Sequence, residues 1–165
     1  MPATFKEYEG ADDDAKITAW IADVLGDADA LPHDTLHENL KSGVVLCNLV
    51  NVVQPNSVKK VSKLPSPFPQ RENVRAFIEA VRAIGVPDAE NFDTDDLFEG
   101  RNMRQVTLCL VSLGRKLHDV EGYDGATWVK HAVRKLGNSD GKKFEVKEDA
   151  LWGKSNAEYV ATRHN

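Results

Sequence analysis

The sequence contains very few cysteines, only two among 165 residues. Cys47 and Cys109 both lie in apolar runs with helical spacing. At such positions a cysteine usually packs as a small hydrophobic side chain. We therefore expect two reduced, buried thiols rather than a disulfide or a reactive pair.

Long hydrophobic runs are also absent. The most apolar stretch, Leu40–Pro55 (LKSGVVLCNLVNVVQP), is shorter than the roughly 20 apolar residues that span a bilayer, and it includes Asn48 and Asn51. The first residues, MPATFKEYEGADDDAK, are acidic and lack the apolar core of a signal peptide. The sequence therefore predicts no membrane span and a cytoplasmic protein.

Motifs of catalysis and metal binding are missing as well. There is no glycine-rich phosphate loop and no nucleophile elbow. His33 and His37 are four residues apart, but no cysteine or carboxylate completes a zinc set. The run Asp93–Asp96 begins like a calcium loop, yet Leu97 occupies the third ligand position, so a helix-capping turn explains it better. We expect no enzyme activity, no cofactor and no metal.

Positive charge is scarce in the first part of the chain. Residues 1–100 hold 9 Lys+Arg against 18 Asp+Glu, and residues 101–165 hold 12 against 8, so their net charges are −9 and +4. The total of −5 does not fit the strong basic excess of a dedicated nucleic-acid binder, and we expect no nucleic acid among the partners. The basic second part favours a partner with an acidic surface.

Helical periodicity accounts for most of the remaining sequence, and glycine and proline separate the segments. The predicted helices are Ala15–Leu25, Asp34–Leu40, Leu40–Pro55, Gln70–Ile84, Asn102–Val120 and Gly125–Leu136. Leu40–Pro55 and Asn102–Val120 are apolar on nearly all sides, so we expect them to pack directly against each other. Residues 56–69 are predicted to form an irregular surface loop. No segment alternates like a strand, so the expected fold class is all-α.

Four blocks of the sequence resemble the calponin homology domains. They are ITAWIADVL, LKSGVVLCNLVNVVQP, FPQRENVRAFIEAVRAIGV and DLFEGRNMRQVTLCLVSLGR, in this order. FPQREN and GRNMRQV are similar to the single-domain calponin and transgelin type. The resemblance implies a compact bundle of about four main helices plus short connecting helices. It implies an N-terminal arm over residues 1–14 and a calponin homology domain over residues 15–120.

Residues 121–165 resemble, more weakly, the C-terminal extension of transgelin-like proteins. TWVKHAV and KKFEVKED are similar to the linker helix and the basic step that follows it. LWGKSNAEYVATRHN keeps Gly153, Ser155 and Asn156 of a calponin-like repeat and lacks the rest. In calponin and transgelin relatives this repeat is implicated in contacting filamentous actin. Its degenerate form here therefore favours weaker binding to actin.

The resemblance implies an actin-filament-binding protein of the cytoplasm and actin cytoskeleton, with bundling or stabilisation of filaments as associated activities. The alternative is a non-enzymatic adaptor that binds signalling or cytoskeletal proteins through the domain and has weak or no affinity for actin. A binder of microtubule tips ranks below both, because that branch has a more basic domain.

The surface of filamentous actin is acidic, so basic side chains are the candidate contacts. They lie on or beside the last core helix and in the segments after it: Arg101, Arg104, Arg115, Lys116, Lys130, Arg134, Lys135, Lys142, Lys143 and Lys154. The exposed face around Trp20 is a secondary candidate, although Trp20 itself is expected in the core. Surface charge pairs contribute about 0–1 kcal/mol each, so several must act together and binding should weaken with salt.

Overall fold

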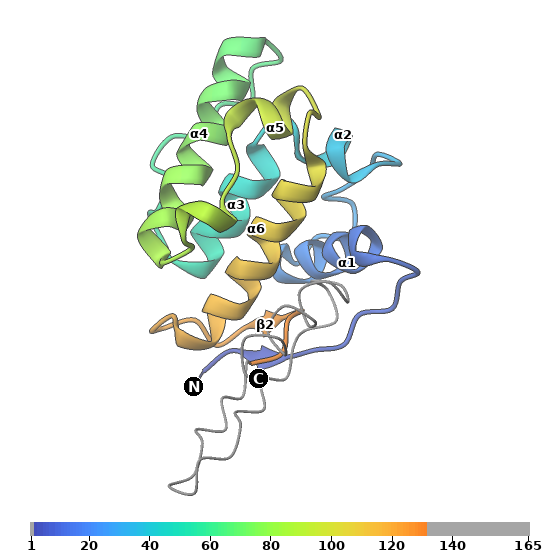
Figure 1. Cartoon of the computed structure of the whole chain (residues 1–165), viewed down its shortest axis with the longest axis vertical. Helices are drawn as coiled ribbons and strands as arrows, with labels where there is room; N and C mark the ends of the chain where they lie inside the picture. Colours follow the sequence, from blue (N-terminus) through green and yellow to red (C-terminus); the bar gives the residue numbers. More distant parts are fainter. Residues whose placement is uncertain (1, 132–165) are drawn as a thin grey trace, which may run out of the picture.

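Six α-helices and two 3₁₀ helices make up most of residues 2–131, the part of the chain that the computed structural model describes (Figure 1). The α-helices are α1 (Asp13–Leu25), α2 (Leu36–Leu40), α3 (Val44–Val53), α4 (Pro67–Ile84), α5 (Thr94–Phe98) and α6 (Met103–Lys116). The 3₁₀ helices are η1 (Asp88–Glu90) and η2 (Leu117–Asp119). Four long helices with short connecting ones confirm the predicted all-α fold class.

The centre of the bundle is α3, where Leu46, Cys47, Leu49 and Val50 are fully buried. This helix makes its most extensive contacts with α4 and then with α1, whereas α6 contacts mainly α5 and η2. Direct packing of α6 against α3 stays a prediction. The α6 helix is not apolar all round, since its first turn carries the exposed Arg104.

A buried asparagine joins α3, α4 and the loop between them. Asn73 in α4 is 2% exposed, and its Nδ2 donates to the carbonyl oxygens of Ser42 (3.0 Å) and Ser62 (2.7 Å). Its Oδ1 accepts from the backbone N–H of Ser62 (3.0 Å), and its carbonyl accepts from the Cys47 thiol (3.1 Å). Gly43, at φ 79°, permits this approach, because a Cβ there would lie 2.5 Å from the Cβ of Asn73.

The helix boundaries differ from the predicted ones by a few residues. Pro67 begins α4 because the first position of a helix needs no backbone N–H. The helix expected over Asp34–Leu40 begins at Leu36, after the N-cap Thr35, whose side chain accepts from the Glu38 N–H at 3.2 Å. Asp93 and Asp96 form a capping box at the start of α5, which confirms the capping explanation of the acidic run.

Residues 125–131 do not form the helix that was expected over Gly125–Leu136, and 132–136 lie outside the described residues. Ala126–Thr127 is instead the short strand β2. Its Thr127 hydroxyl donates to the Gly114 carbonyl at 2.6 Å, and Trp128 Nε1 donates to the Leu110 carbonyl at 3.3 Å. These contacts with α6 hold the segment extended and override its local helical pattern.

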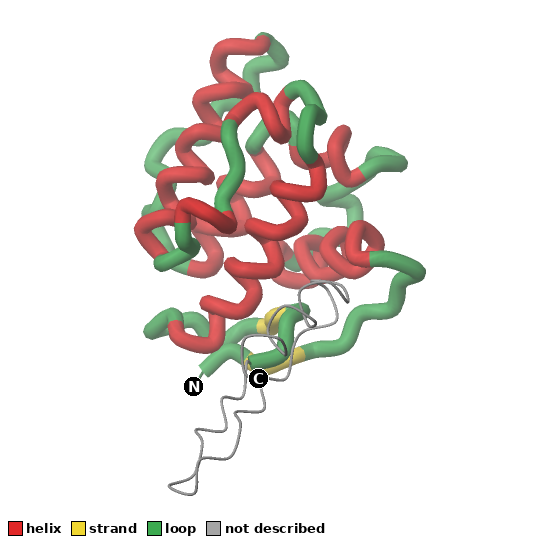
Figure 2. Tube along the Cα trace, viewed as in Figure 1, coloured by secondary structure: helices red, strands yellow, loops and turns green. Residues whose placement is uncertain are grey.

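The first residues of the chain pair with this segment. Strand β1 (Thr4–Phe5) runs parallel to β2, and Figure 2 shows the two strands side by side below α1. Tyr8 then donates from its hydroxyl to Asp23 at 2.6 Å, and Lys6 Nζ lies 2.9 Å from the same carboxylate. The two ends of the described chain are thus joined to each other and to α1.

Both cysteines are free and buried, as predicted. Among the helices of residues 2–131, none combines the length and the apolar character needed to span a membrane.

Candidate functional site

The structure describes half of the predicted basic site and divides it into two groups. Arg101 and Arg104 lie at the start of α6, and Arg115 and Lys116 lie at its end. With about 1.5 Å of rise per residue, this helix is roughly 20 Å long, so the groups do not form one patch. Lys130 is the fifth candidate in the described part of the chain. The remaining five lie outside the described residues: Arg134, Lys135, Lys142, Lys143 and Lys154.

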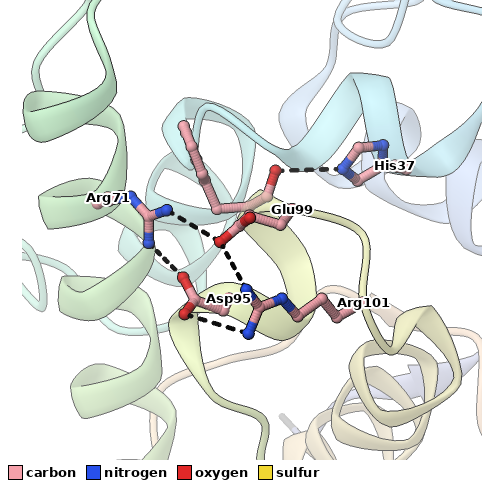
Figure 3. Close-up of polar contacts among 6 residues, drawn as sticks. His37, Arg71, Asp95, Glu99 and Arg101 are labelled. Atoms are coloured by element: carbon pink, nitrogen blue, oxygen red, sulfur yellow. Dashed lines mark hydrogen bonds and ion pairs between the residues drawn. The ribbon is translucent and has the colours of Figure 1, made fainter.

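At the start of α6, Arg101 belongs to an ion-pair network (Figure 3). Its guanidinium lies 3.3 Å from Glu99 and 3.9 Å from Asp95. Arg71 of α4 reaches the same two carboxylates, binding Asp95 directly and Glu99 at 3.3 Å. Two arginines therefore share two carboxylates, and the charge of Arg101 is compensated locally.

The network also covers the aromatic ring of Phe98. The guanidinium of Arg71 lies 4.4 Å from the ring centroid, and Lys41 Nζ lies 6.0 Å from it. The Nε2 atom of His37 is 3.4 Å from the Phe98 carbonyl oxygen. The hydrogen bond from Arg71 lowers the pKa of Asp95 below its ordinary value, so this carboxylate stays charged. These contacts tie α2, α4 and α5 together, which is a structural role.

At the end of α6, basic side chains lie on different elements. Lys116 covers Gly85, where a Cβ would lie 3.7 Å from its Cδ and 3.9 Å from its Nζ. Because Gly85 caps the C-terminus of α4, the ammonium group is also favoured there by the helix dipole. Arg115 and Lys116 are half-buried, whereas Lys130 is exposed and its Nζ lies 5.3 Å from the Phe5 ring centroid.

Two tryptophans support this end of the molecule. Trp20 is fully buried, as predicted, and its Nε1 donates to the Ala126 carbonyl at 2.9 Å. Its ring stacks on Trp128 with 6.2 Å between centroids. His118 Nε2 lies 2.8 Å from the Val129 carbonyl oxygen. The backbone that leads into Lys130 is therefore held against the core, and Trp20 itself is not available to a partner.

No cluster of three or more His, Cys, Asp and Glu side chains within residues 2–131 is arranged to hold a metal ion. The backbone of His33 binds the Asn39 amide, donating its N–H to Oδ1 at 2.7 Å and accepting from Nδ2 at its carbonyl oxygen at 3.0 Å. The His37 ring instead faces the Phe98 carbonyl oxygen.

Two exposed apolar residues are not among the predicted site residues. Leu64 and Phe68 are 61% and 63% exposed, which is unusual for large hydrophobic side chains. The signal was present in the FPQREN block, since Phe68 stands outside the spacing by which Val74, Phe77 and Val81 face the core. The expectation of an irregular loop over residues 56–69 does not distinguish these two residues from their neighbours, and Phe68 lies in the first turn of α4.

This fold and sequence define the chain as a member of the calponin homology family. The pattern of the calponin homology (CH) domain matches residues 11–119. The calponin homology domain of an IQGAP protein from Schizosaccharomyces pombe has a similar structure, with a TM-score of 0.58 at 27% identity over 76% of this chain and 77% of that one. Calponin-family proteins with this domain are non-enzymatic.

Relatives of the calponin and transgelin type are similar in sequence. Myophilin from Echinococcus granulosus is 38% identical over 73% of this chain and 65% of its own length. Muscle-specific protein 20 from Drosophila melanogaster is 35% identical, over 68% and 60%. Calponin-2 from Mus musculus is 35% identical, over 62% and 33%. The chain thus matches less than two thirds of the length of each of these relatives.

Proposed function

We propose that this chain binds actin filaments, as a cytoskeletal protein of the calponin and transgelin type. The observation that carries the proposal is that Arg115 and Lys116 end α6, and that the exposed Lys130 follows Val129, whose carbonyl oxygen lies 2.8 Å from His118 Nε2 just after this helix. Residues 130–165 hold 8 Lys+Arg against 5 Asp+Glu. An acidic filament surface is the complementary partner.

The two ends of α6 contribute unequally in this proposal. Arg101 already faces Asp95 and Glu99, so an acidic partner would compete with carboxylates of the chain itself. Arg104 is exposed and remains a secondary contact. We place the main surface at the other end of α6, because Arg115, Lys116 and Lys130 there lead in sequence into the basic C-terminal part. That part includes Arg134, Lys135, Lys142, Lys143 and Lys154, which lie outside the described residues. We keep residues 1–14, 15–120 and 121–165 as the proposed arm, domain and extension.

Each of these side chains adds little by itself. An exposed charge pair contributes about 0–1 kcal/mol, so measurable affinity requires several pairs and some apolar contact. Ionic strength screens such pairs over roughly 10 Å at 0.1 M salt. Binding should consequently weaken steadily as salt is added.

High-speed cosedimentation of the full chain with actin filaments tests the proposal. We expect the protein to pellet with filaments at low salt, and less so as salt increases. A chain ending at Leu136 should pellet less than the full chain, because it lacks Lys142, Lys143 and Lys154. Low-speed pelleting then separates bundling from decoration, since cross-linking requires two sites or a dimer.

The second candidate function is that of an adaptor that binds another protein through the domain. Its specific support is the pair of exposed apolar side chains, Leu64 and Phe68, which lies apart from the proposed filament surface in the chain. Full-length protein that stays in the supernatant with filaments at low salt would favour this function over actin binding.

A further inference from the structure

A short exposed segment precedes and begins α4. Residues 63–68 (KLPSPF) are exposed at every position and include both Leu64 and Phe68. Among residues 2–131, the only other large hydrophobic side chain of comparable exposure is Val52, at 45%. We take these two exposed apolar side chains, four residues apart, as the apolar part of a candidate interaction site.

The loop that carries this segment is fixed at two points. The amide of Asn51 in α3 binds the backbone of Val58 on both sides, accepting from its N–H at 2.8 Å and donating to its carbonyl at 3.0 Å. Asn73 binds the backbone of Ser62 in the same way, at 3.0 Å and 2.7 Å. Only residues 63–66 separate the second anchor from α4. A partner would therefore meet a preformed surface, which reduces the entropy lost on binding.

The exposed segment lies within a group of basic residues, here called the basic island, in an acidic part of the chain. Residues 59–75 hold five of the nine Lys and Arg of residues 1–100: Lys59, Lys60, Lys63, Arg71 and Arg75. They hold one of its 18 Asp and Glu, which is Glu72, so the island carries +4. The other residues of that part hold 4 basic and 17 acidic side chains, a net charge of −13. Arg71 is used by Asp95 and Glu99, whereas Lys59, Lys60, Lys63 and Arg75 are exposed.

We propose that Leu64 and Phe68, with Lys59, Lys60 and Lys63 on the same loop, form a docking surface for a short acidic segment of a partner protein that carries large apolar side chains. The charge of the island selects an acidic segment, and the two apolar residues select hydrophobic side chains within it. Below, this set of five residues is called the loop surface. It differs from the proposed filament surface, so the inference does not depend on actin binding.

A synthetic peptide tests the inference on the full chain. The probe is a peptide of about 12 residues, rich in Asp and Glu, with Leu and Phe four positions apart. Titration into isotope-labelled protein, followed by amide chemical shifts, should perturb residues 59–75 and should weaken with salt. A second peptide, with Leu and Phe replaced by Ser, should bind more weakly by about tenfold or more, because it leaves the apolar side chains of the protein without partners.

Protein variants provide matched controls. Leu64→Ser with Phe68→Ser should weaken binding of the probe by about tenfold or more, since both apolar contacts are lost. Val52→Ser removes an exposed apolar side chain outside the loop surface and should leave the affinity unchanged. Reversal of Lys59, Lys60 and Lys63 to Glu should weaken binding of the acidic probe at low salt, and added salt should no longer weaken it further, because repulsion replaces attraction. All six side chains changed in these tests are at the surface, so amide spectra should show that each variant remains folded.

Several results would overturn the inference. One is the absence of shifts at millimolar probe, and another is a set of shifts centred on residues 101–116 rather than 59–75. Equal affinity for the Ser-substituted peptide would reduce the surface to non-specific charge attraction. Self-association that disappears in the Leu64→Ser, Phe68→Ser variant would make a second copy of the chain the occupant. Loss of filament cosedimentation in that variant would assign the loop surface to actin, which overturns this inference but leaves the proposed function standing.

Discussion

Trp20 in α1 stacks on Trp128, the residue after β2, with ring centroids 6.2 Å apart and an angle of 30° between the planes. The two residues come from opposite ends of the described chain, and they are 0% and 5% exposed. The stacking makes residues 125–129 part of the core of the domain. Lys130, which follows this segment directly, is therefore held at a fixed position on the surface.

Replacement of Trp128 by Ala should destabilise the whole domain. The change removes a buried indole, its stacking on Trp20 and its hydrogen bond to the Leu110 carbonyl. We expect a loss of about 3–5 kcal/mol in the free energy of unfolding, measured by urea denaturation with circular dichroism. Trp128→Phe, which keeps an aromatic ring, should lose less. A loss below about 1 kcal/mol for Trp128→Ala would mean that residues 125–129 are not part of the core.

Two glycines with positive φ separate steric crowding from backbone strain. Gly26 and Gly43 have φ of 66° and 79°, but a Cβ at Gly26 meets nothing within 4 Å, whereas at Gly43 it lies 2.5 Å from the Cβ of Asn73. Gly26→Ala should lose about 1–2 kcal/mol from backbone strain alone. Gly43→Ala should lose about 2–5 kcal/mol, because overpacking against α4 is added.

Chemical denaturation of the two variants under the same conditions checks this difference. Equal losses would show that α3 and α4 do not approach at Gly43 as closely as described. A larger loss for Gly26→Ala would contradict the account outright.

The buried thiols should resist modification until the protein unfolds. Burial raises the pKa of Cys47 to about 12, and it raises the pKa of Cys109 as well. The reactive species is the thiolate, whose fraction at pH 8 is therefore very small in the folded protein. Reaction with a chromogenic disulfide reagent should be slow in buffer and should release two equivalents rapidly in denaturant. Rapid reaction of either thiol in the folded protein would contradict its burial.

The link between the N-terminal arm and α1 should weaken in acid. The hydrogen bond from Tyr8, and then the one from Lys6, lowers the pKa of Asp23 below its ordinary value. A carboxyl whose pKa is depressed by folding contributes stability above the unfolded-state pKa of about 4, and this contribution disappears as the pH falls through the lower folded-state value. The melting temperature of Asp23→Asn should thus be lower than that of the wild type at pH 7, and the two should converge in acid. A gap that is the same at both pH values would contradict this role.

The main helices could be predicted from the sequence because each carries a local repeat of apolar residues. Ile17, Trp20 and Ile21 face the core as their spacing indicates, and all three are fully buried. Strands of two residues carry no such repeat, so β1 and β2 could not be found in this way. Trp128 appeared to belong to a helix because the partners that hold it extended are far away in sequence.

Basic composition identified candidate binding residues but not their surroundings. The charge of Arg101 makes it a candidate, yet Asp95 and Glu99 pair with it, and they also bind Arg71, which lies 24 residues before Asp95. The helix predicted over Asn102–Val120 already places Arg104 and Lys116 near its opposite ends, so the sequence indicates that the two residues do not form one patch. The exposure of Phe68 depends on how α4 packs, and local spacing only hints at it.

The central claim is that the basic extension after the domain, and not the loop surface, contacts actin filaments. Cosedimentation of two charge-reversed variants with filaments at low salt tests it most directly: Lys142, Lys143 and Lys154 to Glu in one, and Lys59, Lys60 and Lys63 to Glu in the other. Both carry the same change in net charge. The account predicts that the first variant remains largely in the supernatant while the second pellets nearly as well as the wild type. Equal losses of binding in the two variants would contradict the claim.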